Sequence, residues 1–190
     1  MAVKVITPPA APLTIEELRL QCRIDAVGGT HVEDAWLLDT LADALKFAQH
    51  YTQRSIGSQT LELAMDDFPS CDYFELPQGP VSSITSVKYV DEAGSTITLA
   101  TSEYMLDDYA FPERVALKYG KSWPVARSEP NAVKVVYVSG DTADGSVKQA
   151  LKLYVSNEFD NGRGGGSQKD YELALEAVRT KLNTIKRWGH

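Results

Sequence analysis

Cysteine and long apolar runs are scarce in this sequence, and each scarcity excludes a class of protein. Of the 190 residues only 2 are cysteine, Cys22 and Cys71, and no CxxC pair occurs. A disulfide-stapled secreted scaffold and a cysteine-ligated zinc site are therefore excluded, and we expect two free thiols in a reducing compartment. No stretch approaches the roughly 20 apolar residues of a membrane span, and the first residues lack the apolar core of a signal peptide. We expect a soluble intracellular protein with no membrane partner.

Basic residues are also in the minority. Lys and Arg together number 19 against 26 Asp and Glu, which gives a formal net charge of −7. An acidic surface does not supply the phosphate contacts that hold nucleic acid, so we expect no tight DNA binding. A protein that DNA merely passes is compatible with this charge. Apolar residues make up 43% of the chain, which is enough for a packed core.

The two ends of the chain have the periodicity of helices. Thr14 and Glu17 have the spacing of a capping box, which predicts a short helix over residues 14–22. Apolar residues recur at helical spacing in three further segments. These predict helices from residue 31 or 32 to residue 52, over residues 144–160 and over residues 168–187.

Between the helical ends, residues 59–138 have the alternation of β-strands. The clearest strand covers residues 81–90, and a Pro/Gly turn directly precedes it. Seven strands are predicted, at residues 60–65, 73–76, 81–90, 96–99, 104–106, 114–119 and 132–138. Their spacing is typical of a compact antiparallel sheet or a small sandwich.

The order of these segments predicts an α+β fold with an insertion. We expect the helical parts, residues 14–57 and 140–190, to form a four-helix bundle-like core domain. Residues 58–139 would form an inserted antiparallel β domain. Residues 1–13 contain three prolines, which fix φ and remove backbone donors, so this segment is expected to be an extended N-terminal arm.

The chain contains no evident catalytic or metal-binding set, so we predict no catalytic residue, no metal and no cofactor. The paired acids Asp66 and Asp67, and likewise Asp107 and Asp108, have the chemistry to hold Mg²⁺. Each pair stands beside a turn signal, where Asp is common for backbone reasons. His31 stands at a predicted helix start beside two acids, and the helix dipole favours acids at that position. A metal-dependent hydrolase that uses the paired acids is kept as an alternative, and a generic intracellular binding module is another.

A glycine-rich segment separates the last two predicted helices. It consists of Gly162, Arg163, Gly164, Gly165 and Gly166. A phosphate-binding loop would follow a strand and end in Lys followed by Ser or Thr, and this segment does neither. Four glycines in five residues carry high backbone entropy. We therefore predict a loop that is mobile in the free protein and ordered on assembly.

Two groups of residues have the character of protein–protein contacts. Trp123 and Tyr119 lie in the last third of the β region, where their rings either pack in the core or anchor a partner. Lys186, Arg187 and Trp188 lie near the end of the chain and form either a frayed end or a docking tail.

An ordered set of short motifs spans about residues 12–160. In chain order the motifs are Pro12-Leu-Thr-Ile-Glu-Glu17, Cys22-Arg-Ile-Asp25, Tyr51-Thr-Gln-Arg54, Leu76-Pro-Gln-Gly-Pro-Val81, Ile84-Thr-Ser-Val-Lys-Tyr89, Tyr119-Gly-Lys-Ser-Trp-Pro124, Pro130-Asn-Ala-Val-Lys-Val-Val-Tyr-Val-Ser-Gly140 and Val147-Lys-Gln-Ala-Leu151. As an ordered set, these motifs resemble the long-form head–tail connector, or adaptor, proteins of tailed bacteriophages and prophages.

The resemblance implies a non-enzymatic virion protein that assembles in the host cytoplasm and ends at the head–tail interface. Such adaptors form a homo-oligomeric ring, usually a dodecamer, beneath the portal protein. The ring extends the DNA channel, lets DNA pass without tight binding, and presents a surface to a stopper, tail-completion or tail protein. With a portal as the partner, we assign Lys186, Arg187 and Trp188 to the portal contact.

Overall fold

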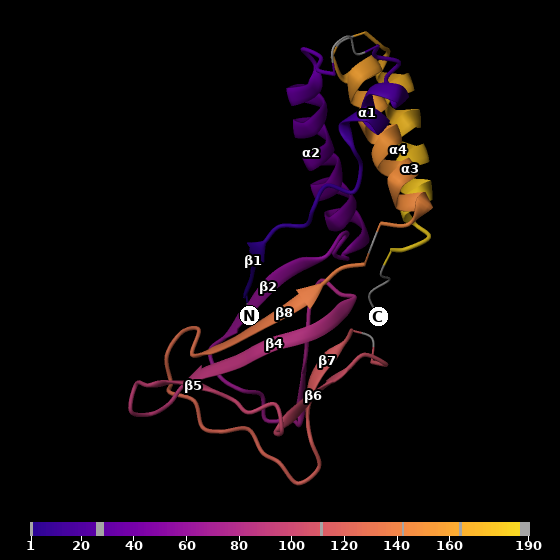
Figure 1. Cartoon of the computed structure of the whole chain (residues 1–190). Helices are drawn as coiled ribbons and strands as arrows, with labels where there is room; N and C mark the ends of the chain where they lie inside the picture. The colour runs from indigo at the N-terminus through magenta and orange to yellow at the C-terminus, as the bar shows by residue number, and fades with distance from the viewer. Residues whose placement is uncertain (1, 26–28, 111, 142, 164, 187–190) are drawn as a thin grey trace. The chain divides into compact units, whose positions relative to one another are not determined.

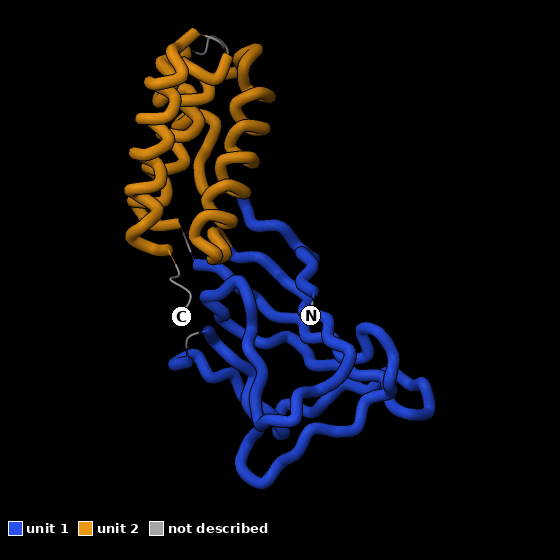
Figure 2. Tube along the Cα trace, turned by 180° about the vertical axis from the view of Figure 1, so that it is seen from behind, with its two compact units in different colours: residues 1–10, 58–141 blue, residues 11–57, 142–190 orange. Residues whose placement is uncertain are grey.

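The computed structural model describes residues 2–25, 29–110, 112–141, 143–163 and 165–186 (Figure 1). Within these residues the chain forms four α-helices and two antiparallel sheets, so the protein is a mixed α+β protein, as predicted. The chain divides into two compact units, coloured blue and orange in Figure 2. The β unit comprises Met1–Ala10 and Ser58–Asp141, and the helical unit comprises Ala11–Gly57 and Thr142–His190.

Three of the four α-helices of the helical unit begin at a side-chain cap that the sequence supplies. The elements are α1 (Ile15–Gln21), α2 (Asp34–Thr52), α3 (Gly145–Asn157), the π-helical turn η1 (Glu158–Gly162) and α4 (Gln168–Leu182). Thr14 and Glu17 form the predicted capping box at α1, with reciprocal bonds of 3.3 and 3.1 Å. The Asp144 side chain caps α3 by accepting from the Val147 backbone N–H, and the Ser167 side chain caps α4 by accepting from the Asp170 backbone N–H. The last helix ends at Leu182, five residues before the predicted end at residue 187.

All four helices contribute to one hydrophobic core. Leu18 of α1 is fully buried in it, so even the shortest helix is part of the core. The other buried core residues on helices are Leu37, Leu41, Ala44, Ala48, Val147, Ala150, Leu151, Val155, Val178 and Leu182. Residues from both ends of the chain therefore depend on one another for burial.

The β unit contains two sheets. The five-stranded sheet has the order β1 (Ala2–Thr7), β2 (Gln59–Met65), β8 (Val133–Ser139), β4 (Val81–Val90) and β5 (Thr96–Thr98). The three-stranded sheet has the order β3 (Tyr73–Glu75), β7 (Arg114–Leu117) and β6 (Tyr104–Asp107). All strand pairs are antiparallel, and all seven predicted strands are present.

The eighth strand, β1, lies in the segment expected to be an N-terminal arm. It pairs with β2, with Ala2 opposite Ala64 and Val5 opposite Leu61. Residues 1–10 therefore belong to the β unit rather than to a separate arm. The prolines at positions 8 and 9 follow the strand, where a missing backbone donor costs no ladder bond.

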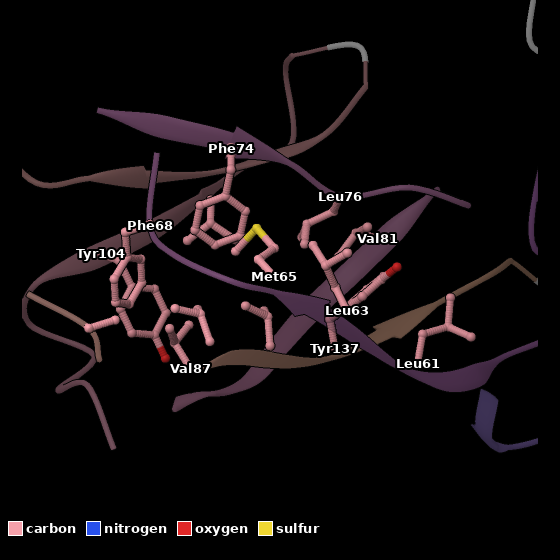
Figure 3. Close-up of a cluster of buried hydrophobic side chains, with 14 of the residues drawn as sticks. Leu61, Leu63, Met65, Phe68, Phe74, Leu76, Val81, Val87, Tyr104 and Tyr137 are labelled. Atoms are coloured by element: carbon pink, nitrogen blue, oxygen red, sulfur yellow. The ribbon is translucent and has the colours of Figure 1, made fainter. Parts of the chain in front are cut away.

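Tyr137 stands at the centre of the core of the β unit (Figure 3). Alternate residues of β2 and β8 point into this core, which gives their strict alternation of buried and half-exposed positions. Tyr137 is fully buried, and its hydroxyl donates to the Pro77 carbonyl at 2.7 Å. Aromatic rings also pack together here: the Phe68 ring stacks on the Trp123 ring, with their centroids 5.0 Å apart.

Candidate assembly surfaces

The first pair of acids makes turn contacts. Asp66 Oδ1 accepts a hydrogen bond from the Asn131 backbone N–H at 2.9 Å. Asp67 Oδ1 accepts one from the Phe68 backbone N–H at 2.7 Å. Asp67 thus has the ordinary role of Asp beside a turn, whereas Asp66 binds a backbone donor that lies 65 residues away, just before β8.

The second pair of acids stands at the end of β6. Asp107 accepts from Arg114 Nε at 2.8 Å and from the Ala110 backbone N–H at 3.2 Å. The hydrogen bond from Arg114 is the main cause that lowers the pKa of Asp107. Asp108 directly follows the strand.

Across the described residues, no three His, Cys, Asp or Glu side chains are grouped so as to hold a metal ion. None of the described helices is long and apolar enough to cross a membrane.

A charge cluster fixes the start of α2. The Asp34 carboxylate accepts from Arg19 Nε at 2.7 Å and from the His31 backbone N–H at 2.8 Å. Arg19 also donates to the Gly29 carbonyl at 3.1 Å, and only 6% of this residue is exposed. His31 Nδ1 accepts from the Glu33 backbone N–H at 3.1 Å. His31 therefore has the helix-start role that the sequence indicated, and Arg19 ties α1 to α2.

Acid should weaken this cluster over a defined pH range. The hydrogen bond from Arg19 lowers the pKa of Asp34 from 3.8 to about 2. Because the folded-state pKa lies below the unfolded-state value, the contribution of Asp34 to stability is complete above about pH 4 and disappears as the pH falls through 2. We expect Asp34→Asn to flatten the dependence of the unfolding free energy on pH between those values. Asp39→Asn, at an exposed position of the same helix, is the matched control.

Urea denaturation at a series of acidic pH values measures this effect. The wild-type protein and Asp39→Asn should lose stability with similar slopes between about pH 4 and pH 2, and Asp34→Asn should have a smaller slope. Equal slopes for all three proteins would contradict the assignment of this acid sensitivity to Asp34.

The glycine-rich segment packs against the end of the preceding helix. Gly162 is the last residue of η1. A Cβ atom on Gly165 would stand 2.7 Å from the Asp160 carbonyl oxygen. A Cβ atom on Gly166 would stand 1.8 Å from Asn161 Oδ1. Glycine at these two positions therefore permits a close approach of the chain to itself, in addition to any freedom it gives the backbone.

Arg163 holds this segment against α2. Its guanidinium donates to the two carboxylate oxygens of Glu33 at 3.0 and 3.4 Å. It also lies over the rings of Trp36 and Phe159, 4.8 and 5.4 Å from their centroids. Sequence reasoning included Arg163 only as part of a mobile loop, because a partner so distant in the chain leaves no local signal. Gly164 lies outside the described residues.

Replacement of Gly165 should destabilise the helical unit. We expect Gly165→Ala to lower the free energy of unfolding by about 1–3 kcal/mol, because the added methyl group meets a backbone oxygen that cannot turn away. Gly145→Ala is the matched control, since a Cβ atom there meets nothing within 4 Å. Thermal and urea unfolding measure both variants. Equal stability of the two variants would contradict the packing role of Gly165. The mobility of the segment in the free protein stays a separate prediction, which hydrogen exchange tests.

The predicted docking tail begins at an anchored residue. Lys186, the last described residue, places its Nζ atom 4.3 Å from the centroid of the Tyr51 ring. The Tyr51 hydroxyl donates to Asn183 Oδ1 at 2.8 Å, so the end of α4 is tied to the end of α2. Arg187 and Trp188 lie outside the described residues.

Trp123 is partly buried and packs against the core of the β unit. Its ring stacks on Phe68 and lies 5.4 Å from the Phe74 ring, centroid to centroid. Its indole Nε1–H donates to the Cys71 carbonyl at 2.9 Å. Both the apolar body and the polar atom of this side chain are therefore used within the unit.

Tyr119, in contrast, is fully exposed on a turn that is tied down on both sides. On one side Lys118 Nζ donates to the Thr101 carbonyl at 2.9 Å. On the other side Lys121 Nζ donates to Glu103 Oε1 at 3.0 Å. The turn that carries Tyr119 is therefore held by its neighbours, and exposed tyrosine rings are enriched at interface hot spots.

Comparison with known proteins gives a whole-chain match at the level of fold. No protein-family model matches the sequence, and none of the curated proteins matches it. The fold is similar to a chain in the neck of an empty gene transfer agent (GTA) particle computed with C6 symmetry, with a TM-score of 0.77 and 20% identity. It is also similar to a chain in the virion of a native GTA particle, with a TM-score of 0.74 and 20% identity. A third similar chain is in the neck of a native GTA particle computed with C12 symmetry, with a TM-score of 0.72 and 21% identity. Each match covers 100% of this chain and 99% of the other.

Proposed function

We propose that this protein is a structural adaptor in the neck of a phage-like particle, at the head–tail interface. Copies of the chain form a ring, with the helical unit as its bundle-like core domain. The ring joins the portal to the tail or to the next connector and extends the DNA channel. The observation that carries this proposal is the fold match to neck proteins over the full length of both chains, with a TM-score of 0.77. The ordered motifs within residues 12–160, which resemble phage adaptors, support it independently.

The alternative of a metal-dependent hydrolase has no comparable support. Asp66 and Asp67 accept backbone hydrogen bonds, and Asp107 is paired with Arg114. A hydrolase would need several of these carboxylates to converge on one ion, and they are separately engaged. The generic binding module differs from the adaptor in one measurable respect, which is the absence of a ring.

Native mass spectrometry and electron microscopy of the purified chain, alone and with a portal protein, test the proposal. We expect a cyclic oligomer, with twelve copies as in a C12 neck, that docks onto the portal. A protein that stays monomeric at all concentrations and binds no portal would overturn the proposal. A monomer that binds other cellular proteins instead would favour the generic binding module.

DNA should pass such a ring without sticking to it. Each copy contributes a formal net charge of −7, so the ring as a whole repels phosphate. We expect fluorescence anisotropy with labelled duplex DNA to show no tight binding to the purified ring, even at low salt. Tight binding that weakens steeply with added salt would contradict this expectation.

A further inference from the structure

The strand β1 is weakly anchored in the five-stranded sheet. It lies at the edge of the sheet and pairs only with β2 (Figure 1). Five of its six residues are exposed, and Val3 is the one that packs against the core of the β unit. Lys4 stands opposite Glu62, but within the described residues these two side chains form no ion pair. The backbone ladder with β2 therefore holds the strand almost alone, and such a segment opens at a low free-energy cost.

The other edge strand of this sheet, β5, is exposed as well but cannot leave its partner easily. A short turn joins β4 to β5, and the Asp91 backbone N–H closes this turn by donating to the Ser95 carbonyl at 2.9 Å. No turn joins β1 to β2, because the paired residues Thr7 and Thr60 are separated by more than fifty residues of chain. The strand β1 can therefore be replaced on β2 by an identical strand without the opening of a hairpin.

The connector after β1 favours an extended chain. Residues 8–13 have no regular secondary structure and contain three prolines, at positions 8, 9 and 12. The connector ends at Leu13, which is buried in the core of the helical unit and so fixes one end of it. Proline favours the polyproline II conformation, which rises about 3.1 Å per residue, so the six steps from Thr7 to Leu13 span up to about 19 Å. A stiff connector of this length can present β1 to an adjacent copy.

We propose that copies of the chain exchange β1, so that β1 of each copy in the ring pairs with β2 of the next copy. The inference rests on the proposed ring and assigns one contact between its subunits. The exchanged strand keeps the register that the single chain shows, in which Lys4 stands opposite Glu62, and it makes the same ladder bonds. Because each copy gives one strand and receives another, the contact is head-to-tail, and a head-to-tail contact is the kind that generates a closed ring.

Cross-linking of mixed rings is the first test. Rings are assembled from equal amounts of Lys4→Cys copies and Glu62→Cys copies, both with Cys71→Ser. Cys22 stays, because it is half-buried and burial raises its pKa to about 11. We expect a short bismaleimide to join chains in pairs, since position 4 of one copy lies opposite position 62 of the next. No longer species should form, because each copy has only one of the two new thiols. Rings of either variant alone should give no linked chains.

Two controls belong to this test. The double variant Lys4→Cys with Glu62→Cys, as a dilute free copy, should link within one chain, which shows that the two thiols are within reach of each other. Lys88 and Thr98 are registered partners in the β4–β5 hairpin, which keeps both strands in one copy. Mixed rings of Lys88→Cys copies and Thr98→Cys copies should therefore contain no linked chains.

Removal of residues 1–7 is the second test. Because β1 adds little side-chain burial to its own copy, the thermal unfolding midpoint of the free chain should change by less than about 3 °C. The dissociation constant of the ring should rise at least about tenfold, as measured by the concentration dependence of the ring in native mass spectrometry and sedimentation. A truncated chain that forms rings as tight as those of the wild type would contradict the exchange.

The outcomes separate this inference from the proposed function. If rings form but the mixed Lys4→Cys and Glu62→Cys rings give no linked chains, β1 stays on its own copy, and the exchange is overturned while the adaptor proposal stands. If the wild-type chain forms no ring, with or without a portal, both the exchange and the adaptor proposal are overturned.

Discussion

Tyr137→Ala should destabilise the β unit by about 3–5 kcal/mol, the range for removal of a fully buried aromatic ring. Tyr137 lies in β8, the middle strand of the five-stranded sheet, which pairs with β2 on one side and β4 on the other. No part of its side chain is exposed. The cavity would therefore open between strands that come from distant parts of the chain and cannot easily close over it. Urea denaturation followed by circular dichroism measures the change.

Two further variants show where this loss comes from. Tyr137→Phe keeps the ring and removes only the hydrogen bond to the Pro77 carbonyl, so we expect a loss of about 1 kcal/mol. Tyr119→Ala makes the same large truncation at a fully exposed position of the same unit, and we expect a change within about 0.5 kcal/mol. A Tyr119→Ala variant as unstable as Tyr137→Ala would contradict the burial of one ring and the exposure of the other.

The sequence was most informative where one periodicity held over a whole element. The alternation in residues 60–65 and 132–138 predicted β2 and β8, and the Thr14–Glu17 capping box predicted the start of α1. The strand β1 was missed because nearby prolines indicated an extended arm, although Val3 and Val5 already alternate with polar or small residues. Its pairing with β2 depends on a segment more than fifty residues away, and such long-range pairing has no local sequence signal.

The candidate surfaces were less predictable than the fold, for the same reason. The turn role of Asp67 could be predicted, because Asp caps backbone donors close to it in sequence, whereas the Asn131 backbone donor to Asp66 is 65 residues away. The pairing of Arg163 with Glu33 could not, because the two residues are 130 positions apart and only the fold brings them close. The packing of Gly165 against the Asp160 carbonyl is local, but it depends on the π-helical turn η1, which was not predicted.

Removal of residues 187–190 should abolish co-assembly with the portal and leave the folded chain intact. The truncated chain still contains Lys186 and its contact with the Tyr51 ring, so the end of α4 keeps its anchor on α2. We therefore expect an unchanged thermal unfolding midpoint. The deletion removes Trp188, whose burial in a partner groove is worth about 2–3 kcal/mol for one copy. Every subunit of a ring would bury its own Trp188, so the loss of this burial free energy in all copies should reduce the overall affinity by many orders of magnitude.

The point variant Trp188→Ala separates the large apolar side chain from the rest of the tail. If the indole carries the contact, this variant should lose portal docking almost as fully as the truncated chain does, in the same electron microscopy and co-sedimentation assays. If only the truncation has an effect, the basic end of the chain carries the contact, and docking by the wild-type ring should then weaken steeply with added salt. Docking of the truncated ring with wild-type affinity would exclude the tail altogether. The Tyr119 turn would then be the next surface to test, because Tyr119→Ala removes an exposed aromatic ring without a change in stability.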